Sequence, residues 1–220
     1  MTGWPGVPDV ELADAVAGLL DLVATQPENP GVLPIVQAGD PVLRTPAAPY
    51  TGQLGDVLPR LLEAMRRTMR AAPGVGLAAP QIGIGLAIAV CEDVGVPDDL
   101  RERAPLPYRV LVNPRWTPVE DAGEVAFFEG CLSVAGWQAV VARPRSVRLT
   151  CQDEHGDHVD EVLTGWPARI VQHESDHLAG RLYLDAAESR SLTSNDNLAR
   201  FWGAGPDPAP AASRLGFPLP

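Results

Sequence analysis

The chain has 220 residues, and its 17 basic and 28 acidic side chains give a net charge of −11. This length allows one domain with a buried core and makes two full-sized domains unexpected. The acidic balance opposes binding to nucleic acid or anionic lipid, so we expect small or peptide-like partners. No apolar run of about 18 residues could span a membrane, and the N-terminus lacks the basic opening of a secretory signal. We therefore expect a cytoplasmic protein.

The three cysteines, Cys91, Cys131 and Cys151, are odd in number and widely spaced, which argues against a disulfide framework. A cysteine with a function in this chain would then act as a ligand or a nucleophile. The sequence shows no obvious stripe for self-association, so we expect a monomer.

The N-terminal part is helical by pattern. Residues 9–24 form a short acidic amphipathic stretch that Pro, Asn and Gly then interrupt, so residues 1–32 are interpreted as an arm with one helix. From Leu54 to Met69 apolar side chains recur at helical spacing until "AAPGVG" stops the pattern. This predicts a second helix whose apolar face belongs to the core.

The middle of the chain is rich in predicted strands. Short extended candidates are "LAIAVCED", "YRVLVNP" and "GWQAVVA". In "SVRLTCQDEHGDHVDEVLT" two alternating stretches flank a polar turn, which is typical of a hairpin. His155 and His158 lie at or near this turn, where we expect solvated side chains without a ligand role.

The chain then returns to helix and ends in a tail. "TGWPARIVQHESDHLAG" offers Thr164 as a cap, Pro167 in the first turn and Gly180 to close the helix. Residues 186–220 become rich in Pro and Ala at their end, which predicts an extended or disordered terminus. The predicted fold class is α+β, with mixed or antiparallel strands around this central helix and a further helix at the N-terminus.

Within that helix, "HESDH" matches the pattern HExxH. Residues four apart lie on one helix face, so His173 and His177 can both direct an imidazole nitrogen at one ion. Glu174 could then take a proton from a water on that ion and deliver it to a leaving nitrogen. We predict a catalytic metal site here in preference to a merely polar helix face.

A catalytic site of this kind normally has three protein ligands and one open position. Tyr183 stands where one large class of metalloproteases has its third His. Glu188 lies close in sequence and just before a Ser/Asn-rich stretch, which makes it a poor candidate. Cys91 and Cys151 lie in strand-like stretches, where a buried thiol behaves as a small hydrophobic group.

Cys131 is the remaining candidate for the third ligand. It lies in "EGCLS", where Gly130 allows close approach of the backbone and no apolar alternation requires a Cys. In isolation, a loop thiol without function would be the preferred interpretation. Together with the two His, it predicts a tetrahedral site with an open fourth position.

Three motifs in this chain together resemble those of peptide deformylases: "GVGLAAPQ" at 74–81, "EGCLS" at 129–133 and "QHESDH" at 172–177. "GDPVLR" at 39–44 also looks like the start of that family. The resemblance spans residues 33–185, which we interpret as a deformylase-like catalytic domain between the arm 1–32 and the tail 186–220.

The resemblance implies metal-dependent hydrolysis of the N-formyl group from the formyl-methionine of newly made polypeptides, with release of formate. It implies that Cys131, His173 and His177 hold the metal and that Glu174 is the general acid and base. Fe(II) is the native ion by resemblance, although Zn(II), Ni(II) or Co(II) would suit the same donors.

The other implied roles concern the oxyanion and the substrate. Gln81, through its side-chain amide, and Leu132, through its backbone N–H, would stabilise the oxyanion. Val75, Gly76 and Gly130 would contact the substrate near its first residue. For Gly76 we expect that the missing side chain leaves room for an extended peptide. For the neighbouring Gly74 we expect only a turn.

Some features limit or extend the resemblance. Asp176 is expected to pair with Arg143 and brace the metal helix. Gly136, Trp137 and Gln138 stand where several relatives carry charged residues, so the preference for later substrate residues stays open. The expected partners are N-formylated nascent peptides. We expect proximity to the ribosome without a basic C-terminal tether.

Two alternatives stay open at this point. A metal-dependent peptidase or amidase with another substrate would keep the metal and the base. A non-catalytic protein with a structural metal would require a fourth protein ligand, and none is visible in the sequence.

Overall fold

The structure is a computed structural model that describes residues 9–203 and 205–220. Its helices and strands are as follows: α1 Asp9–Ala24, α2 Leu58–Ala71, β1 Gly76–Ala78, β2 Ile88–Asp93, β3 Leu106–Pro118, β4 Glu124–Cys131, β5 Val134–Pro144, β6 Ser146–Gln152, β7 His158–Thr164, α3 Gly165–Leu178, β8 Thr193–Ser194, α4 Asn195–Asn197, a π-helical turn Leu198–Trp202 and α5 Ala209–Leu215. Over this part of the chain, none of the helices has the length and apolar character needed to cross a membrane.

The strands form two sheets. One has five strands in the order β1-β2-β3-β6-β7, and the other has three in the order β4-β5-β8. Each pairing between these strands is antiparallel. The predicted hairpin is confirmed, because β6 and β7 pair in register from Ser146 with Thr164 to Gln152 with His158. The antiparallel α+β architecture is therefore confirmed as well.

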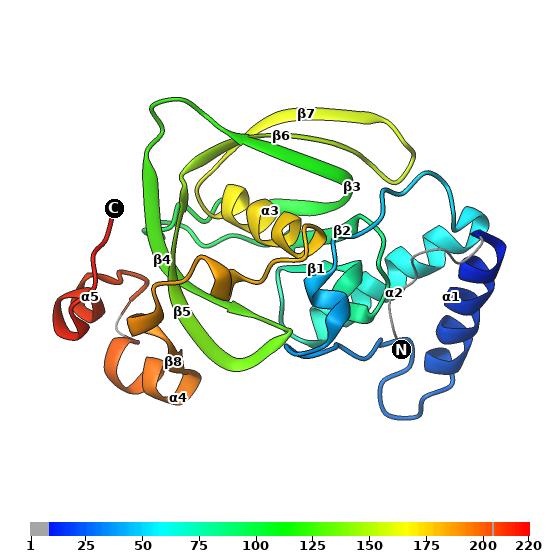
Figure 1. Ribbon diagram of the computed structural model, residues 1–220, viewed down its shortest axis with the longest axis horizontal. Helices are drawn as coiled ribbons and strands as arrows, with labels where there is room; N and C mark the ends of the chain where they lie inside the picture. Colours follow the sequence, from blue (N-terminus) through cyan, green and yellow to red (C-terminus); the bar gives the residue numbers. More distant parts are fainter. Residues whose placement is uncertain (1–8, 204) are drawn as a thin grey trace.

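Helix α3 lies between the two sheets (Figure 1). Its apolar side chains Ile170, Val171 and Leu178 share a buried cluster with Leu111 and Leu149 of the five-stranded sheet. Its other side meets β4 and β5 through charged side chains. The sequence thus produces a helix with one apolar and one ionised buried face.

The ends of α3 were predicted with one error. Gly180 adopts a left-handed conformation with φ of 72° and its N–H donates to the His177 carbonyl, which closes the helix. Thr164 does occupy the N-cap position, but its side chain makes no capping hydrogen bond. The Thr164 hydroxyl instead lies 2.8 Å from the Ser146 hydroxyl, because the two residues are paired across β6 and β7.

The N-terminal helices pack on one end of the molecule. Helix α1 has the predicted bounds, and its Leu12, Val16 and Leu20 are buried in one cluster with Leu61 and Met65 of α2. The second predicted helix begins as a short 3-10 turn and becomes α-helical only at residue 58, four residues after its predicted start.

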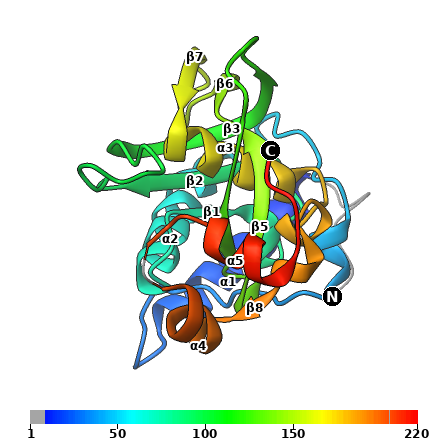
Figure 2. The same ribbon diagram turned by 90° about the vertical axis from the view of Figure 1, so that its left-hand side faces the viewer.

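The prediction of an extended or disordered C-terminus was wrong over residues 209–215, which form α5. Asp207 accepts a hydrogen bond of 2.9 Å from the Ala209 N–H at the helix start, and prolines fit a first turn because their missing N–H has no partner there anyway. The helix covers the three-stranded sheet on the side away from α3 (Figure 2). Its contacts form one cluster of buried side chains: Ala126, Val140, Ala211, Ala212 and Phe217.

Candidate metal centre and substrate cleft

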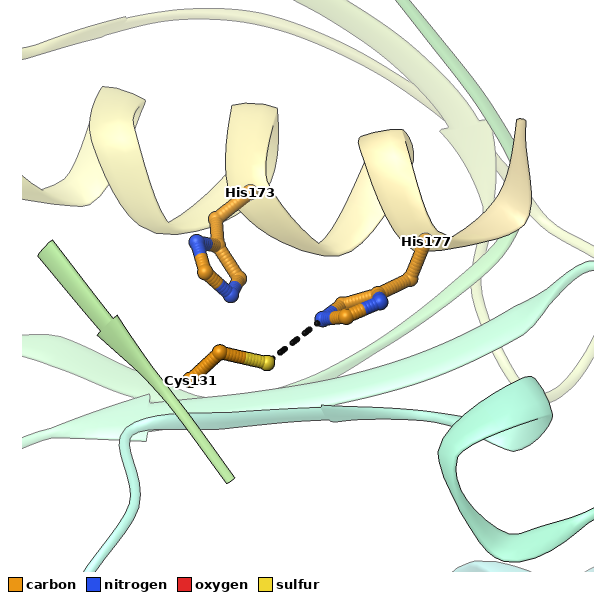
Figure 3. Close-up of side chains that lie close together, drawn as sticks. All are labelled: Cys131, His173 and His177. Carbon is orange, nitrogen blue, oxygen red and sulfur yellow. Dashed lines mark hydrogen bonds between the residues drawn. The ribbon is translucent and has the colours of Figure 1, made fainter. Parts of the chain in front are cut away.

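Three side chains from two elements converge beside α3. Cys131 ends β4, while His173 and His177 lie on successive turns of the helix (Figure 3). One ligand atom from each lies within 4.8 Å of the others, and the Cys131 Sγ is 3.2 Å from the His177 Nε2. The two imidazole rings are 5.1 Å apart between centroids. The structure therefore brings together the three residues that the sequence singled out as ligands.

The donor chemistry of this cluster fits a metal ion. A thiolate and two imidazoles are common ligands of divalent metals, and three protein ligands leave one coordination position open. Among the described residues no fourth His, Cys, Asp or Glu joins the group. The Nε2 of His177 faces Cys131, and its Nδ1 is buried without a hydrogen-bond partner among the described residues. Cys91 and Cys151 are buried within strands, as predicted, and lie outside the cluster.

Glu129 is the centre of a buried charged network behind His173. Its carboxylate is bonded by the Arg143 guanidinium at 2.7 and 3.0 Å, by Arg169 at 2.5 Å and by the His173 Nδ1 at 3.1 Å. Burial alone would raise the pKa of Glu129, but the charge of Arg143 and the hydrogen bonds from His173 and Arg143 hold it well below its usual value. Glu129 is therefore ionised and fixes the orientation of His173.

Asp176 extends this network along the helix. The Arg143 Nη1 donates to one of its carboxylate oxygens at 2.8 Å, and the Arg181 Nη2 donates to the other at 2.7 Å. The predicted pairing of Asp176 with Arg143 is thus confirmed. Since Arg143 also holds Glu129, one guanidinium joins β4, β5 and α3.

Glu174 differs from these acidic residues in its surroundings. Only 4% of it is exposed, and its Oε2 is buried with no hydrogen-bond partner in the part of the chain that the structure describes. Burial raises the pKa of Glu174 to about 7, against the opposing charges of His173 and Arg143. A carboxyl group with this pKa can both accept and release a proton near neutral pH.

Gln81 presents a fixed amide to the same place. Its Oε1 accepts a hydrogen bond of 2.8 Å from the Ala78 N–H, which orients the amide group. Its Nε2 lies 3.5 Å from the Cys131 Sγ and 3.3 Å from the Ser133 hydroxyl. Leu132, between these two residues in sequence, lines the adjoining cleft.

The cleft beside this cluster has a volume of about 580 Å³. Its walls include the three residues expected near the first substrate residue: Val75, Gly76 and Gly130. Strand β1 lies at one edge of the five-stranded sheet and pairs there with β2 alone among the described strands. The opposite side of β1 is therefore an edge of the sheet among the described residues.

Part of the cleft lining is uncharged. Trp137, Gln138 and Asn195 form this part, and the Gln138 Nε2 donates to the Asn195 Oδ1 at 3.1 Å. Asn195 follows the short strand β8, which pairs with β5 at Trp137 and Gln138. The sequence did not suggest that residues beyond 185 reach the cleft.

Glu129, Arg169 and Ser133 were also given no role from the sequence. Glu129 and Ser133 belong to the "EGCLS" motif, and an acidic residue directly after two phenylalanines was a signal that could have been used. Tyr183, where a third His was considered, instead stacks on His173 with centroids 6.2 Å apart.

Comparison with known proteins agrees with this site. The family model for polypeptide deformylase matches residues 32–192. The chain is 60% identical over 219 residues to Peptide deformylase 3 of Streptomyces avermitilis, covering 97% of this chain and 96% of that protein. It is 63% identical over 195 residues to Peptide deformylase 1 of Streptomyces coelicolor, covering 86% of this chain and 88% of that protein.

A similar solved structure is a class I type b peptide deformylase from Acinetobacter baumannii with Met-Ala-Ser bound. It superposes with a TM-score of 0.64 at 34% identity, covering 70% of this chain and 98% of that one. An actinonin complex of a deformylase from Synechococcus elongatus has a TM-score of 0.62 at 32% identity and covers 88% of this chain and 89% of that one. The chain belongs to the polypeptide deformylase family.

Proposed function

We propose that this cleft is where the protein removes the N-formyl group from nascent polypeptides, the reaction of its family. The observation that carries the assignment of residues is the convergence of Cys131, His173 and His177 beside Glu174. These three would hold one divalent ion. When bound, such an ion supplies a Lewis acid that lowers the pKa of a water ligand toward neutrality.

Glu174 is the proposed proton carrier. Its carboxylate lies in the cleft wall and is almost fully buried, and its raised pKa suits transfer in both directions. We assign it the proton of the attacking water, which it then delivers to the leaving amine nitrogen. The products are formate and a free amino terminus.

Gln81 and Leu132 are the proposed oxyanion donors. The Gln81 amide is held by Ala78, so its NH2 group is already directed at the ligand cluster before substrate arrives. Leu132 would contribute its backbone N–H. Neutral donors that are fixed in advance stabilise developing negative charge without reorganising during the reaction.

The proposed substrate contacts are Val75, Gly76 and Gly130. An extended peptide would pair with the free edge of β1, which leaves its side chains to the cleft walls. The walls next to the ligands would receive the first residue, formyl-methionine. We propose that later residues of the substrate pass the uncharged pair of Gln138 and Asn195, because both side chains line the cleft.

The substrate assignment is tested by comparing formyl-Met-Ala-Ser with acetyl-Met-Ala-Ser. We expect kcat/KM for the acetylated peptide to be lower by roughly 10- to 200-fold or more, because the pocket must exclude one extra methyl group. Equal rates on both peptides would favour a general amidase and overturn the proposal.

The native metal is proposed to be Fe(II), with Zn(II), Ni(II) and Co(II) as ions that the same donors accept. Anaerobic purification with elemental analysis, followed by activity with each ion after chelation, tests this. We expect the iron form to lose activity in air, with oxidation of Cys131 detectable by mass spectrometry. A zinc-only protein that is stable in air would contradict it.

We also propose that the protein acts as a cytoplasmic monomer close to the ribosome, because its substrates are nascent chains. Helix α5 carries one basic residue, Arg214, so a basic C-terminal tether is not part of the proposal. The division into an arm 1–32, a catalytic domain 33–185 and a tail 186–220 is likewise a proposal.

A further inference from the structure

Gly76 occupies a position whose backbone does not require glycine. It is absent from the residues with positive φ, and it begins β1 in antiparallel register with Cys91. L-amino acids with side chains readily adopt this extended region. The reason for glycine here must therefore lie in the space around its Cα atom.

That space is filled by Glu174. A Cβ atom at residue 76 would overlap the Glu174 Oε1 and would lie 2.5 Å from its Cδ and 2.8 Å from its Cγ. Because the conflict reaches back to Cγ, turning the carboxylate alone cannot relieve it. Glu174 is buried on a helix that packs directly against β1, so the whole side chain would have to move.

Two other glycines show that this requirement is local. A Cβ at Gly74 would meet the tip of a flexible side chain, the Leu132 Cδ1, at 2.9 Å. A Cβ at Gly85 would have no atom within 4 Å, and its φ is also not positive. Of these three glycines, only Gly76 leaves room for the inner atoms of a buried carboxylate.

Packing is also what determines where this carboxylate lies. The Oε2 of Glu174 has no hydrogen-bond partner in the described part of the chain. The carboxylate of Glu129, by contrast, is held by two guanidinium groups and an imidazole. A group without such bonds takes the position that its neighbours leave open.

We propose that Gly76 is a positioning residue for Glu174, which holds its place at the cleft because residue 76 has no side chain. This rests on the proposed role of Glu174 as the proton carrier. The proposal is compatible with a peptide that pairs with the backbone of Gly76. Backbone hydrogen bonds run within the plane of the sheet, whereas a Cβ atom would point out of that plane. The proposal assigns to the glycine a contact within the protein in addition to one with substrate.

A thermal unfolding cycle on the metal-loaded protein tests the contact without using activity. Gly76→Ala should lower the unfolding midpoint in the wild type but not in a Glu174→Ala background, where alanine at an ordinary φ is neutral or stabilising. Gly85→Ala, the matched control, should lower it in neither. An equal decrease from Gly76→Ala in both backgrounds would overturn the proposal.

The same cycle is informative when a variant fails to fold. An insoluble Gly76→Ala variant alongside a folded Gly76→Ala/Glu174→Ala double variant supports the proposal. Failure of both to fold overturns it, because the methyl group would then conflict with something other than Glu174.

Kinetics separate positioning from substrate binding. Gly76→Ala should lower kcat by about a hundredfold with little change in KM, the cost of a misplaced catalytic group. A glycine needed only for peptide access would instead raise KM at constant kcat. Adding Gly76→Ala to Glu174→Ala should cost little further kcat, since alanine has no Cγ for the new methyl group to meet.

The proposed function and this inference can fail separately. If Glu174→Ala kept full turnover, Glu174 would lose its catalytic role, yet the background-dependent shift in the unfolding midpoint would still establish the contact.

Discussion

The side chains around α3 form two groups that differ in how well their polar atoms are bonded. On the cleft side, the Glu174 Oε2 is buried and has no hydrogen-bond partner among the described residues. Behind it, Glu129, Arg143 and Asp176 each bind at least two charged groups. The Glu174 carboxylate can therefore still form hydrogen bonds to a ligand. The side chains of the second group already use their hydrogen bonds to hold one another in place.

This difference has a physical basis. Removing a charged group from water is costly, and a buried ion is tolerated only when several partners surround it. The network of Glu129, Arg143 and Asp176 meets this condition, so damage to it should appear as lost stability. Glu174 does not meet this condition, so its replacement should lower turnover and leave stability nearly unchanged. The following variants test that division, from the largest expected effect to the smallest.

Glu174→Ala should lower kcat by about 10²- to 10⁴-fold, because general acid-base catalysis contributes that much. Metal content by elemental analysis and the unfolding midpoint should stay close to wild type, since the carboxylate makes no bond at Oε2. Glu154→Ala, which removes an exposed carboxylate from the β6-β7 turn, is the control and should leave kcat unchanged. Turnover retained in Glu174→Ala would remove its assigned role.

Arg143→Ala should destabilise the fold by about 3–5 kcal/mol, because it leaves two buried carboxylates without their shared cation. Its neighbour Arg145 provides a matched control, since the Arg145–Glu102 pair is exposed and Arg145→Ala should not change stability measurably. Denaturant unfolding of both variants measures the difference. Equal stabilities would show that the buried network is not what holds α3 to the three-stranded sheet.

Gln81→Leu should lower kcat by about a hundredfold or more, the usual effect of removing one oxyanion donor. KM for formyl-Met-Ala-Ser should change little, because the donor acts mainly in the transition state. Steady-state kinetics with a near-UV spectrum to confirm folding measure this. A change confined to KM would assign Gln81 to substrate binding.

Glu129→Gln should weaken metal binding by about 10- to 100-fold, the usual effect of losing the partner of a metal-bound His. Gln keeps the shape of the side chain but removes the charge that His173 and two arginines share. Competition with a chelator measures the affinity. Unchanged affinity with reduced stability would place Glu129 wholly in the supporting network.

Sequence reasoning recovered several elements of the fold that have one buried face. Helix α1 and the β6-β7 hairpin each have a solvent side, so their polar and apolar residues alternate with the right period. Strand β4 was missed because both of its faces are covered. Ala126 packs in the cluster with α5, while Phe127 lies under the Arg169 guanidinium on the other side.

The failures to predict β4 and α5 therefore have one cause. Helix α5 covers the outer face of β4. Neither element has the periodic pattern of polar and apolar residues from which it could have been predicted. Helix α5 consists mostly of Pro, Ala and other residues without large apolar side chains. Its stability therefore depends on tertiary packing more than on an amphipathic pattern.

The candidate site was predicted where local spacing determines geometry. His173 and His177 follow from the helical repeat, and Cys131 followed by elimination among three cysteines. Glu129 could not be found in this way, since its partners Arg143 and Arg169 come from two other elements. The space that Gly76 leaves for Glu174 likewise exists only once β1 and α3 are packed together.

The position of α5 also bears on the order in which the molecule folds. Ala126 and Phe217 share a cluster although they lie far apart in the sequence, whereas β6 and β7 are joined by a short turn. Contacts between distant residues form late because a long loop must close first. We expect α5 to pack onto β4 and β5 after both local hairpins have formed, so that the outer face of the three-stranded sheet is covered late in folding.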